Sequence, residues 1–373
     1  MKHRPAQAFL AAMSPQLVVK RVRTPLATLA IASLGGAAAA WIGLPLPWLI
    51  GAQISLCAVA LMGVRLFGQA PSWPAGSRGL FLPILGLMVG SAFTMEILQT
   101  IPDWWPSLLA LTVFLVVAHG LVFAVFLRIG RYDIPTAFFA SFPGGFLEAI
   151  LLGVRAGGDE RIIQVQHFLR ISLIVFLIPI GFWLYEGQLV GSMSDVAAVA
   201  GSAKPVWSDY LVLALAGISG TLFARRFRLP APDISGAVLF GATVNIIGLT
   251  HGATPPQMLI AVTQLVVGTS LGVGFVGIAW RDLVQAFGLS VAAFLITMSL
   301  ALGTAIALHD WLGADIESLL LALAPGGLAE MSLIALTLSL SVPFVVLHHL
   351  YRITFTVLVI PHAYRFIRDR FGA

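Results

Sequence analysis

The chain has 373 residues, of which 59% are hydrophobic and only 10% charged, and its formal net charge is +5. Soluble domains carry roughly 25% charged residues, so this composition excludes an ordinary soluble enzyme and indicates a polytopic membrane protein. The single cysteine, Cys57, excludes a disulfide framework and a cysteine metal cluster.

The chain begins with a basic segment, residues 1–23, that contains a short apolar run. No small-residue cleavage site follows that run, so we interpret residues 1–23 as a cytoplasmic tail and not as a signal peptide.

Ten apolar stretches then follow, each close to the roughly 20 residues needed to cross a bilayer. The first five are Pro25–Gly43, Pro47–Val64, Leu80–Leu98, Pro106–Leu127 and Ile162–Tyr185. The second five are Asp209–Ala224, Asp233–Leu249, Gln257–Ala279, Ala286–Leu308 and Pro343–Tyr364. The predicted organisation is a tail (1–23), a first membrane repeat (24–186), a linker (187–208) and a second membrane repeat (209–373).

A polar motif occurs twice, 182 positions apart. Phe142-Pro143-Gly144-Gly145-Phe146-Leu147-Glu148 returns as Ala324-Pro325-Gly326-Gly327-Leu328-Ala329-Glu330, and each copy is followed at the same distance by His-x-x-Arg. His167 and Arg170 therefore correspond to His349 and Arg352. This recurrence indicates an internal duplication.

The duplication extends to small residues and prolines. Gly35, Pro45, Pro47 and Gly51 match Gly220, Pro230, Pro232 and Gly236 at an offset of 185. We expect Gly86-x-x-x-Gly90 and Gly268-x-x-x-Gly272 to be close-packing faces of equivalent helices.

The basic residues predict how the two halves are oriented. The positive-inside rule places most arginines between spans in the cytoplasm, together with both termini, and leaves mainly acidic residues outside. This fits five crossings in each half, with the Pro-Gly-Gly segment entering the membrane and returning, so that the second half is inverted. If the segment crossed fully, the halves would be parallel.

Proline followed by two glycines should break a membrane helix, and the N-terminus of the next half-helix would attract an anion. A tight packing turn is the alternative. Broken segments in corresponding positions of two halves are typical of a transporter site. We therefore predict a substrate-binding centre formed by Pro143, Gly144, Gly145, Glu148, His167, Arg170, Pro325, Gly326, Gly327, Glu330, His349 and Arg352.

Two roles are open for the charged members of this centre. The arginines could contact an anion while Glu148 and Glu330 carry an ion or proton, or Glu–Arg pairs could only hold helices together. His167 and His349 could titrate near neutral pH or serve as hydrogen-bonded packing histidines.

Cofactor chemistry finds little support in the sequence. Gly272-Val-Gly274-Phe-Val-Gly277 spells a dinucleotide fingerprint, but it lies inside a membrane span with no preceding strand. The histidines lack a recurring ligand spacing, so we predict neither a metal nor another cofactor. An enzymatic role is therefore not favoured.

The duplicated Pro-Gly-Gly-x-x-Glu in a hydrophobic chain of this length resembles the bacterial AbrB-like membrane family, over about Pro25 to Pro361. The family is labelled as a regulator or as an ammonia monooxygenase. The resemblance implies a tandem duplication of one all-α membrane domain in a Gram-negative inner membrane.

Three functional hypotheses follow. The favoured one is a secondary transporter or permease for a small, anionic solute, with the bilayer, the solute and further copies of the chain as partners. The second is a membrane regulator that senses a ligand and, lacking a separate soluble domain, does not bind nucleic acid directly. The third, less favoured, is a membrane monooxygenase, which would need metal or flavin ligands that we cannot assemble.

Overall fold

The structure is a computed structural model that describes residues 15–144, 146–186 and 205–371. Most of the predicted tail and most of the predicted linker lie outside these ranges. Within the described part the chain is helical, and its only β pairing is an isolated bridge between Leu66 and Gln69. Apolar helices without strands agree with the high mean hydropathy of +0.97, and the prediction of an all-α protein is confirmed.

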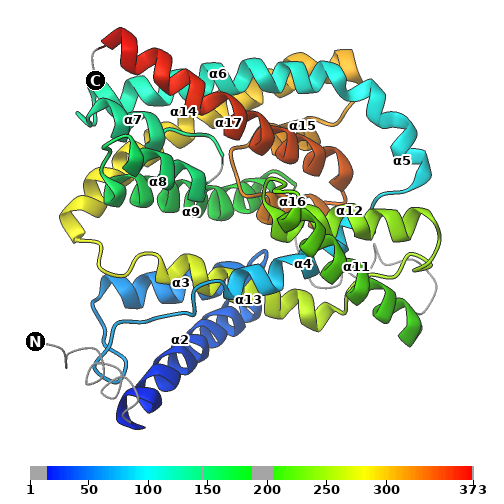
Figure 1. Ribbon diagram of the computed structural model, residues 1–373, viewed down its shortest axis with the longest axis horizontal. Helices are drawn as coiled ribbons and strands as arrows, with labels where there is room; N and C mark the ends of the chain where they lie inside the picture. Colours follow the sequence, from blue (N-terminus) through cyan, green and yellow to red (C-terminus); the bar gives the residue numbers. More distant parts are fainter. Residues whose placement is uncertain (1–14, 145, 187–204, 372–373) are drawn as a thin grey trace, which may run out of the picture. The chain divides into compact units, whose positions relative to one another are not determined.

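The helices are shown in chain order in Figure 1. In the first half they are α2 (Pro15–Trp41), α3 (Pro47–Leu61), α4 (Ser77–Gly90), α5 (Met95–Thr100), the short 3₁₀ helix η1 (Ile101–Trp104), α6 (Trp105–Arg128), α7 (Ile134–Ala140), α8 (Phe146–Arg155) and α9 (Glu160–Glu186). In the second half they are α11 (Trp207–Arg226), α12 (Pro232–Ile246), α13 (Gln257–Val273), α14 (Trp280–Leu312), α15 (Ile316–Leu323), α16 (Leu328–Thr337) and α17 (Val342–Phe371).

Six helical stretches of the described chain are long and apolar enough to cross a membrane. They are Val22–Trp41, Met95–Arg128, Glu160–Tyr185, Trp207–Arg226, Trp280–Leu312 and Val342–Arg370. They coincide with six of the ten predicted spans.

The other four predicted spans fall on α3, α4, α12 and α13, which have 15, 14, 15 and 17 residues. A 15-residue helix is only about 22 Å long, shorter than the roughly 30 Å hydrocarbon core. Apolar sequence continues through the turns that end these helices, as it does past Gly90 and Val273, and this made the predicted spans too long.

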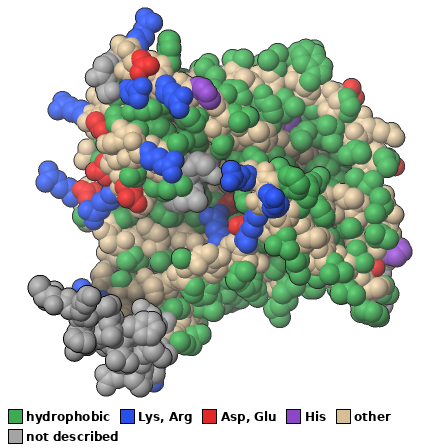
Figure 2. Space-filling view, viewed as in Figure 1, with side chains coloured by type: hydrophobic (Ala, Val, Ile, Leu, Met, Phe, Trp, Pro, Cys, Tyr) green, Lys and Arg blue, Asp and Glu red, His purple; other side chains and the backbone are tan. Residues whose placement is uncertain are grey.

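Large apolar side chains are exposed along the long helices, which is how a lipid-facing surface differs from a soluble one. Examples are Val113 and Val116 on α6, Leu215 and Leu222 on α11, and Leu295 on α14. Figure 2 shows apolar side chains over much of the visible face, with charged side chains gathered near the end of α17. The chain is therefore a membrane-embedded helical protein.

The described helices form two compact units. The first contains residues up to Arg78 together with Ala261–Ile278, and the second contains Gly79–Ile260 and Ala279–Ala373. These units differ from the two halves of the sequence because most of α13, from the second half, packs with α2 and α3.

In the first unit, α2 and α3 cross at two glycines. A methyl group added to Gly35 would overlap the carbonyl oxygen of Gly51, and one added to Gly51 would overlap that of Gly35. The other face of α3 packs on α13, where a methyl group at Gly272 would lie 2.7 Å from Cβ of Leu56. Small residues thus let the backbones approach closely, which is the main source of helix association in lipid.

The second unit repeats both contacts. Gly220 and Gly236 form the same mutual crossing between α11 and α12, at the positions that the offset of 185 had matched. The partner of α12 is α4, because a methyl group at Gly86 would lie 2.7 Å from Cβ of Ala237. The two small-residue motifs therefore serve as close-packing faces, as expected.

The second unit also contains α6 and α14, which lie side by side and antiparallel (Figure 1). The late residues Val122 and Phe126 of α6 share a buried cluster with Leu289 and Ala293, early in α14. Conversely, the early part of α6, with Leu111 and Leu115, packs with Ala301, Ala305 and Leu308, late in α14.

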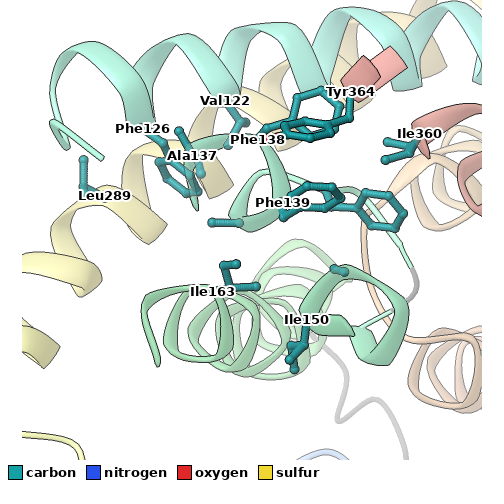
Figure 3. Packing of buried hydrophobic residues seen from close by; sticks show 14 residues of the cluster. Val122, Phe126, Ala137, Phe138, Phe139, Ile150, Ile163, Leu289, Ile360 and Tyr364 are labelled. Carbon is teal, nitrogen blue, oxygen red and sulfur yellow. The ribbon is translucent and has the colours of Figure 1, made fainter. Parts of the chain in front are cut away.

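The cluster near the end of α6 joins parts of the chain that are far apart in sequence (Figure 3). The rings of Phe138 and Phe139, on α7, have their centroids 5.3 and 4.9 Å from the ring of Tyr364 on α17. Many such dispersion contacts, each worth only about 0.1–0.2 kcal/mol per atom pair, fix α7 against α17.

Turns with left-handed backbone recur along the chain. Seven pairs of residues with positive φ are separated by 182 to 185 positions: Gly43 and Arg228, Leu46 and Ala231, Gly63 and Gly248, Phe67 and His251, Gly68 and Gly252, Arg131 and Gly313, and Gly157 and Ser339. In three of these pairs one member is glycine and the other is Arg or Ser, so the equivalence is visible in the backbone but not in the sequence.

Candidate functional site

Both Pro-Gly-Gly segments separate two short helices. In the first copy α7 ends at Ala140 and α8 begins at Phe146, and in the second α15 ends at Leu323 and α16 begins at Leu328. Proline lacks the N–H that would continue the preceding helix, and the glycines leave the backbone unconstrained. The predicted helix break is therefore present in both copies, and we call residues 141–145 and 324–327 the first and second tips.

The second tip is held by Arg352, which is 1% exposed. Its guanidinium donates from Nη1 to the carbonyl oxygen of Ala324 and from Nη2 to that of Gly326. Nη2 also lies 2.7 Å from Nδ1 of His349. The charged side chain thus binds the C-cap carbonyl of α15, at the negative end of that helix, and one carbonyl of the second tip.

His349 completes this arrangement. Since its Nδ1 accepts a hydrogen bond from Arg352, its Nε2 carries the ring hydrogen and donates to the carbonyl oxygen of Leu321, 2.9 Å away. Both ring nitrogens are occupied in the neutral form. This geometry is that of a packing histidine, the second of the two roles considered for it.

The first tip is held in the same way. Arg170 donates to the carbonyl oxygen of Phe142, and its Nη2 lies 2.8 Å from Nδ1 of His167. Nε2 of His167 is 3.0 Å from the carbonyl oxygen of Phe139. Each histidine and each arginine thus binds the carbonyl 28 residues before it, in both copies.

Glu330 is 1% exposed and lies in the first turn of α16. Its carboxylate folds back against Gly327, where any side chain would overlap it. A methyl group at Gly326 would lie 2.7 Å from Met331. Gly327 therefore leaves space for a carboxylate at the positive end of a helix, and Gly326 leaves space for Met331.

The remaining predicted site residues belong to the first tip. Pro143 and Gly144 are buried, and a methyl group at Gly144 would lie 3.1 Å from Oγ1 of Thr356 on α17. Gly145 and the side chain of Glu148 lie outside the described residues.

One cavity brings the two tips together. Pro143 of the first tip and Pro325 of the second both line a cavity of about 20 Å³. A single water molecule needs about 10–15 Å³, so this space fits one or two waters. Its remaining lining residues come from α6, α7, the first tip, α9 and α14: Phe114, Ala118, His119, Val122, Phe126, Ala140, Ser141, Gln166, Arg170, Ser290, Ala293 and Thr297.

Sequence reasoning missed His119 as a cavity residue. The only available signal was an ionisable side chain inside an apolar span, which by itself suggests function. Its neighbour Ser141, the cavity and the second tip are all distant in sequence, so spacing gave no indication of them.

Two polar contacts join the halves. Oγ of Ser290, on α14, donates to Oε1 of Gln166, on α9, at 2.5 Å. Oγ of Ser107, on α6, lies 2.8 Å from Nε2 of His348, on α17. Gln166 and His348 are again 182 positions apart, so each half contributes the same kind of link to the other.

Among the residues that the structure describes, no group of three or more His, Cys, Asp or Glu side chains is placed to hold a metal ion.

These features define an α-helical membrane protein with two copies of a broken-helix motif around a small cavity. The chain belongs to the family described as "Transition state regulatory protein AbrB", whose model matches residues 48–368. The resemblance inferred from the Pro-Gly-Gly-x-x-Glu motif is thereby confirmed.

Two relatives match most of the chain. The "Uncharacterized protein YhjN" of Bacillus subtilis (strain 168) is 27% identical over 370 residues, which cover 92% of this chain and 93% of the relative. The "Putative regulator AbrB" of Escherichia coli (strain K12) is 26% identical over 310 residues, which cover 78% of this chain and 81% of the relative.

Proposed function

We propose that the protein is a secondary transporter or permease for a small anionic solute, with its site at the two tips. The observation that carries this proposal is the shared cavity, because Pro143 and Pro325 come from equivalent broken helices and line it together with Arg170. Broken helices that meet between two halves are the usual binding site of secondary transporters.

The same proposal includes an inverted repeat. Antiparallel packing of the equivalent helices α6 and α14 supports it, since a parallel repeat would orient them alike. The contacts are also reciprocal: α9 packs on α14, and its counterpart α17 packs on α6. Arg128 at the end of α6 corresponds to Asp310 near the end of α14, as expected if these ends face opposite sides of a bacterial inner membrane.

The lengths of the short helices beside the tips support the prediction that each tip segment enters the membrane and returns to its own side. The four short helices have 7, 10, 8 and 10 residues, so each is only about 10–15 Å long. A pair of such helices cannot easily cross about 30 Å of hydrocarbon and leave its tip beside the other one.

An anion is the favoured solute because positive charge converges at the tips. The N-termini of α8 and α16 begin there, and Arg170 acts electrostatically on Arg352. Glu148 and Glu330 remain candidates for an ion or proton carrier. Since the cavity fits only one or two waters, a larger solute requires the tips to move apart, as alternating access would do.

Flux through purified protein tests the proposal. We would reconstitute the full chain in liposomes and measure the uptake of isotopically labelled chloride, nitrate, phosphate, acetate and succinate. Thr297→Phe fills the cavity from α14, whereas Thr304→Phe, two turns along the same helix, lies outside it. We expect saturable flux of at least one anion, reduced at least tenfold in Thr297→Phe and retained in Thr304→Phe.

Equal flux in both variants, with both eluting as folded protein, would remove the cavity from the transport path. A ligand sensor is the second candidate, favoured by the name of the Escherichia coli relative, which calls that protein a regulator. In that case an anion would bind at the cavity, stabilise the protein and produce no flux.

A further inference from the structure

His119 lies midway along α6, inside a membrane-spanning stretch, and its ring lines the cavity between the tips. Phe138 contacts the ring edge-on with centroids 4.7 Å apart, and Phe123 stacks at 6.5 Å. An ionisable side chain at this depth carries a free-energy cost, which is usually a mark of function.

Hydrogen bonds fix which nitrogen of His119 carries the proton. Oγ of Ser141 donates to the carbonyl oxygen of Phe138 at 2.9 Å, so its only hydrogen is used. Nδ1 of His119 lies 3.3 Å from the carbonyl oxygen of Ser141 and 3.4 Å from its Oγ, and both of these can only accept. Nδ1 is therefore the donor, and Nε2 bears the lone pair.

That lone pair is unused. Nε2 of His119 is buried and has no hydrogen-bond partner among the described residues. A buried acceptor without a partner costs about 1–3 kcal/mol, so a ligand that donates to it gains by binding there.

Arg170 supplies the complementary group. Its Nη atoms are engaged by Phe142 and His167, but its Nε is buried and has no partner in the described part of the chain. Arg170 lines the same cavity and its charge acts on His119, so an unused N–H donor, a fixed positive charge and the unused acceptor belong to residues that line one cavity.

We infer that this cavity binds a small carboxylate together with one proton, which His119 Nε2 takes up. The inference rests on the proposed anion site. A carboxylate beside neutral His119 would bring two acceptors together, which repel. Once Nε2 gains a proton, Nε2–H and the Nε–H of Arg170 each donate to one carboxylate oxygen. The carboxylate charge and the proton charge cancel, so the net charge of the site is unchanged.

The lining favours a short carboxylate over an inorganic anion. Two donors suit two oxygens, while Phe114, Ala118, Val122 and Ala293 offer an apolar wall for an alkyl group.

The unused lone pair of His119 accounts for the single proton. Among the described residues, the charged or titratable side chains around this region are Arg170 and His167 on α9, Glu330 beside the second tip on α16 and, across Phe138 and the second tip, Tyr364 and Arg352 on α17. The polar lining side chains of the first tip and of α14 are hydroxyls: Ser141, Ser290 and Thr297. Both nitrogens of His167 are engaged, and the position equivalent to His119 in the second half is Ala301.

Calorimetry counts the proton directly. We would titrate acetate into the purified full-length protein at neutral pH in two buffers with different ionisation enthalpies. We expect uptake of about one proton per acetate bound, and an affinity that weakens about tenfold per unit of pH above neutrality. His119→Gln should bind acetate without proton uptake, whereas His362→Gln, exposed on α17, should match the wild type.

Failure of the inference and failure of the proposed function have different signatures. Acetate binding without proton uptake, unchanged uptake in His119→Gln, or binding of chloride but not acetate would each overturn the inference and leave an anion site in place. Absence of binding and flux for every anion tested would overturn both. The wild-type pH series needs no variant, so the test stands even if His119→Gln does not fold.

Discussion

Replacing Arg352 with methionine separates a structural role from a ligand-binding role. Methionine keeps most of the side-chain volume but removes every donor. The carbonyl oxygens of Ala324 and Gly326 and Nδ1 of His349 then lose their partner inside the protein.

The expected loss of stability follows from the number of carbonyl oxygens that lose their donor. Two orphaned carbonyls cost about 1–3 kcal/mol each, or about 2–6 kcal/mol together. The variant no longer bears the free-energy cost of burying a guanidinium, which offsets part of this destabilisation. We therefore expect the free energy of unfolding to fall by about 3 kcal/mol. Arg170→Met orphans only one carbonyl at a partly exposed site and should cost about half as much. Arg368→Met, at the exposed end of α17, should change stability by less than about 0.5 kcal/mol.

Unfolding by SDS in mixed micelles, followed by tryptophan fluorescence, would rank the three variants. The reasoning is refuted if Arg352→Met is as stable as the wild type, or if the two motif arginines cost the same. Retained stability with loss of anion binding would show that the guanidinium serves the ligand and not the backbone.

Three further pairs of variants test the packing and the orientation. Gly236→Ala should lower the free energy of unfolding by about 1–3 kcal/mol or more, because the added methyl group meets the backbone of Gly220. Gly303→Ala, with open space around it, should raise the free energy of unfolding by up to about 1 kcal/mol. The same SDS titration measures both variants. In a Cys57→Ala background, Arg128→Cys and Asp310→Cys should react with a membrane-impermeant maleimide from opposite sides of the membrane, and labelling from one side would refute the inverted arrangement. Ser290→Ala, which loses the hydrogen bond to Gln166, should cost about 0.6–1.7 kcal/mol, more than Thr304→Ala, whose hydroxyl bonds only within its own helix.

The sequence predicted the features that repeat as residue types. Composition predicted the membrane class, the two Pro-Gly-Gly segments predicted the helix breaks, and the motifs Gly86-x-x-x-Gly90 and Gly268-x-x-x-Gly272 predicted close-packing helix faces. The helix breaks and the close packing depend on what a residue cannot do: a proline nitrogen cannot donate a hydrogen bond, and a glycine has no side chain to fill space.

Features that depend on backbone atoms could not be predicted. The partners of His349 and Arg352 are carbonyls 28 residues earlier, and a carbonyl has no sequence signature. Both roles considered for the arginines involved side chains or ligands, so neither anticipated that Arg352 would cap a helix. The lengths of α3 and α4 were overestimated because their terminal turns are as apolar as the helices.

The exchange of short helices between the halves also sets an order of events during synthesis. α3 needs α13 to cover its small-residue face, yet about 200 residues separate them, which is about 10–40 s of translation at typical bacterial rates. α4 likewise waits for α12. Neither half can complete its packing alone, so a gene split between them should yield fragments that are degraded separately and survive only when made together.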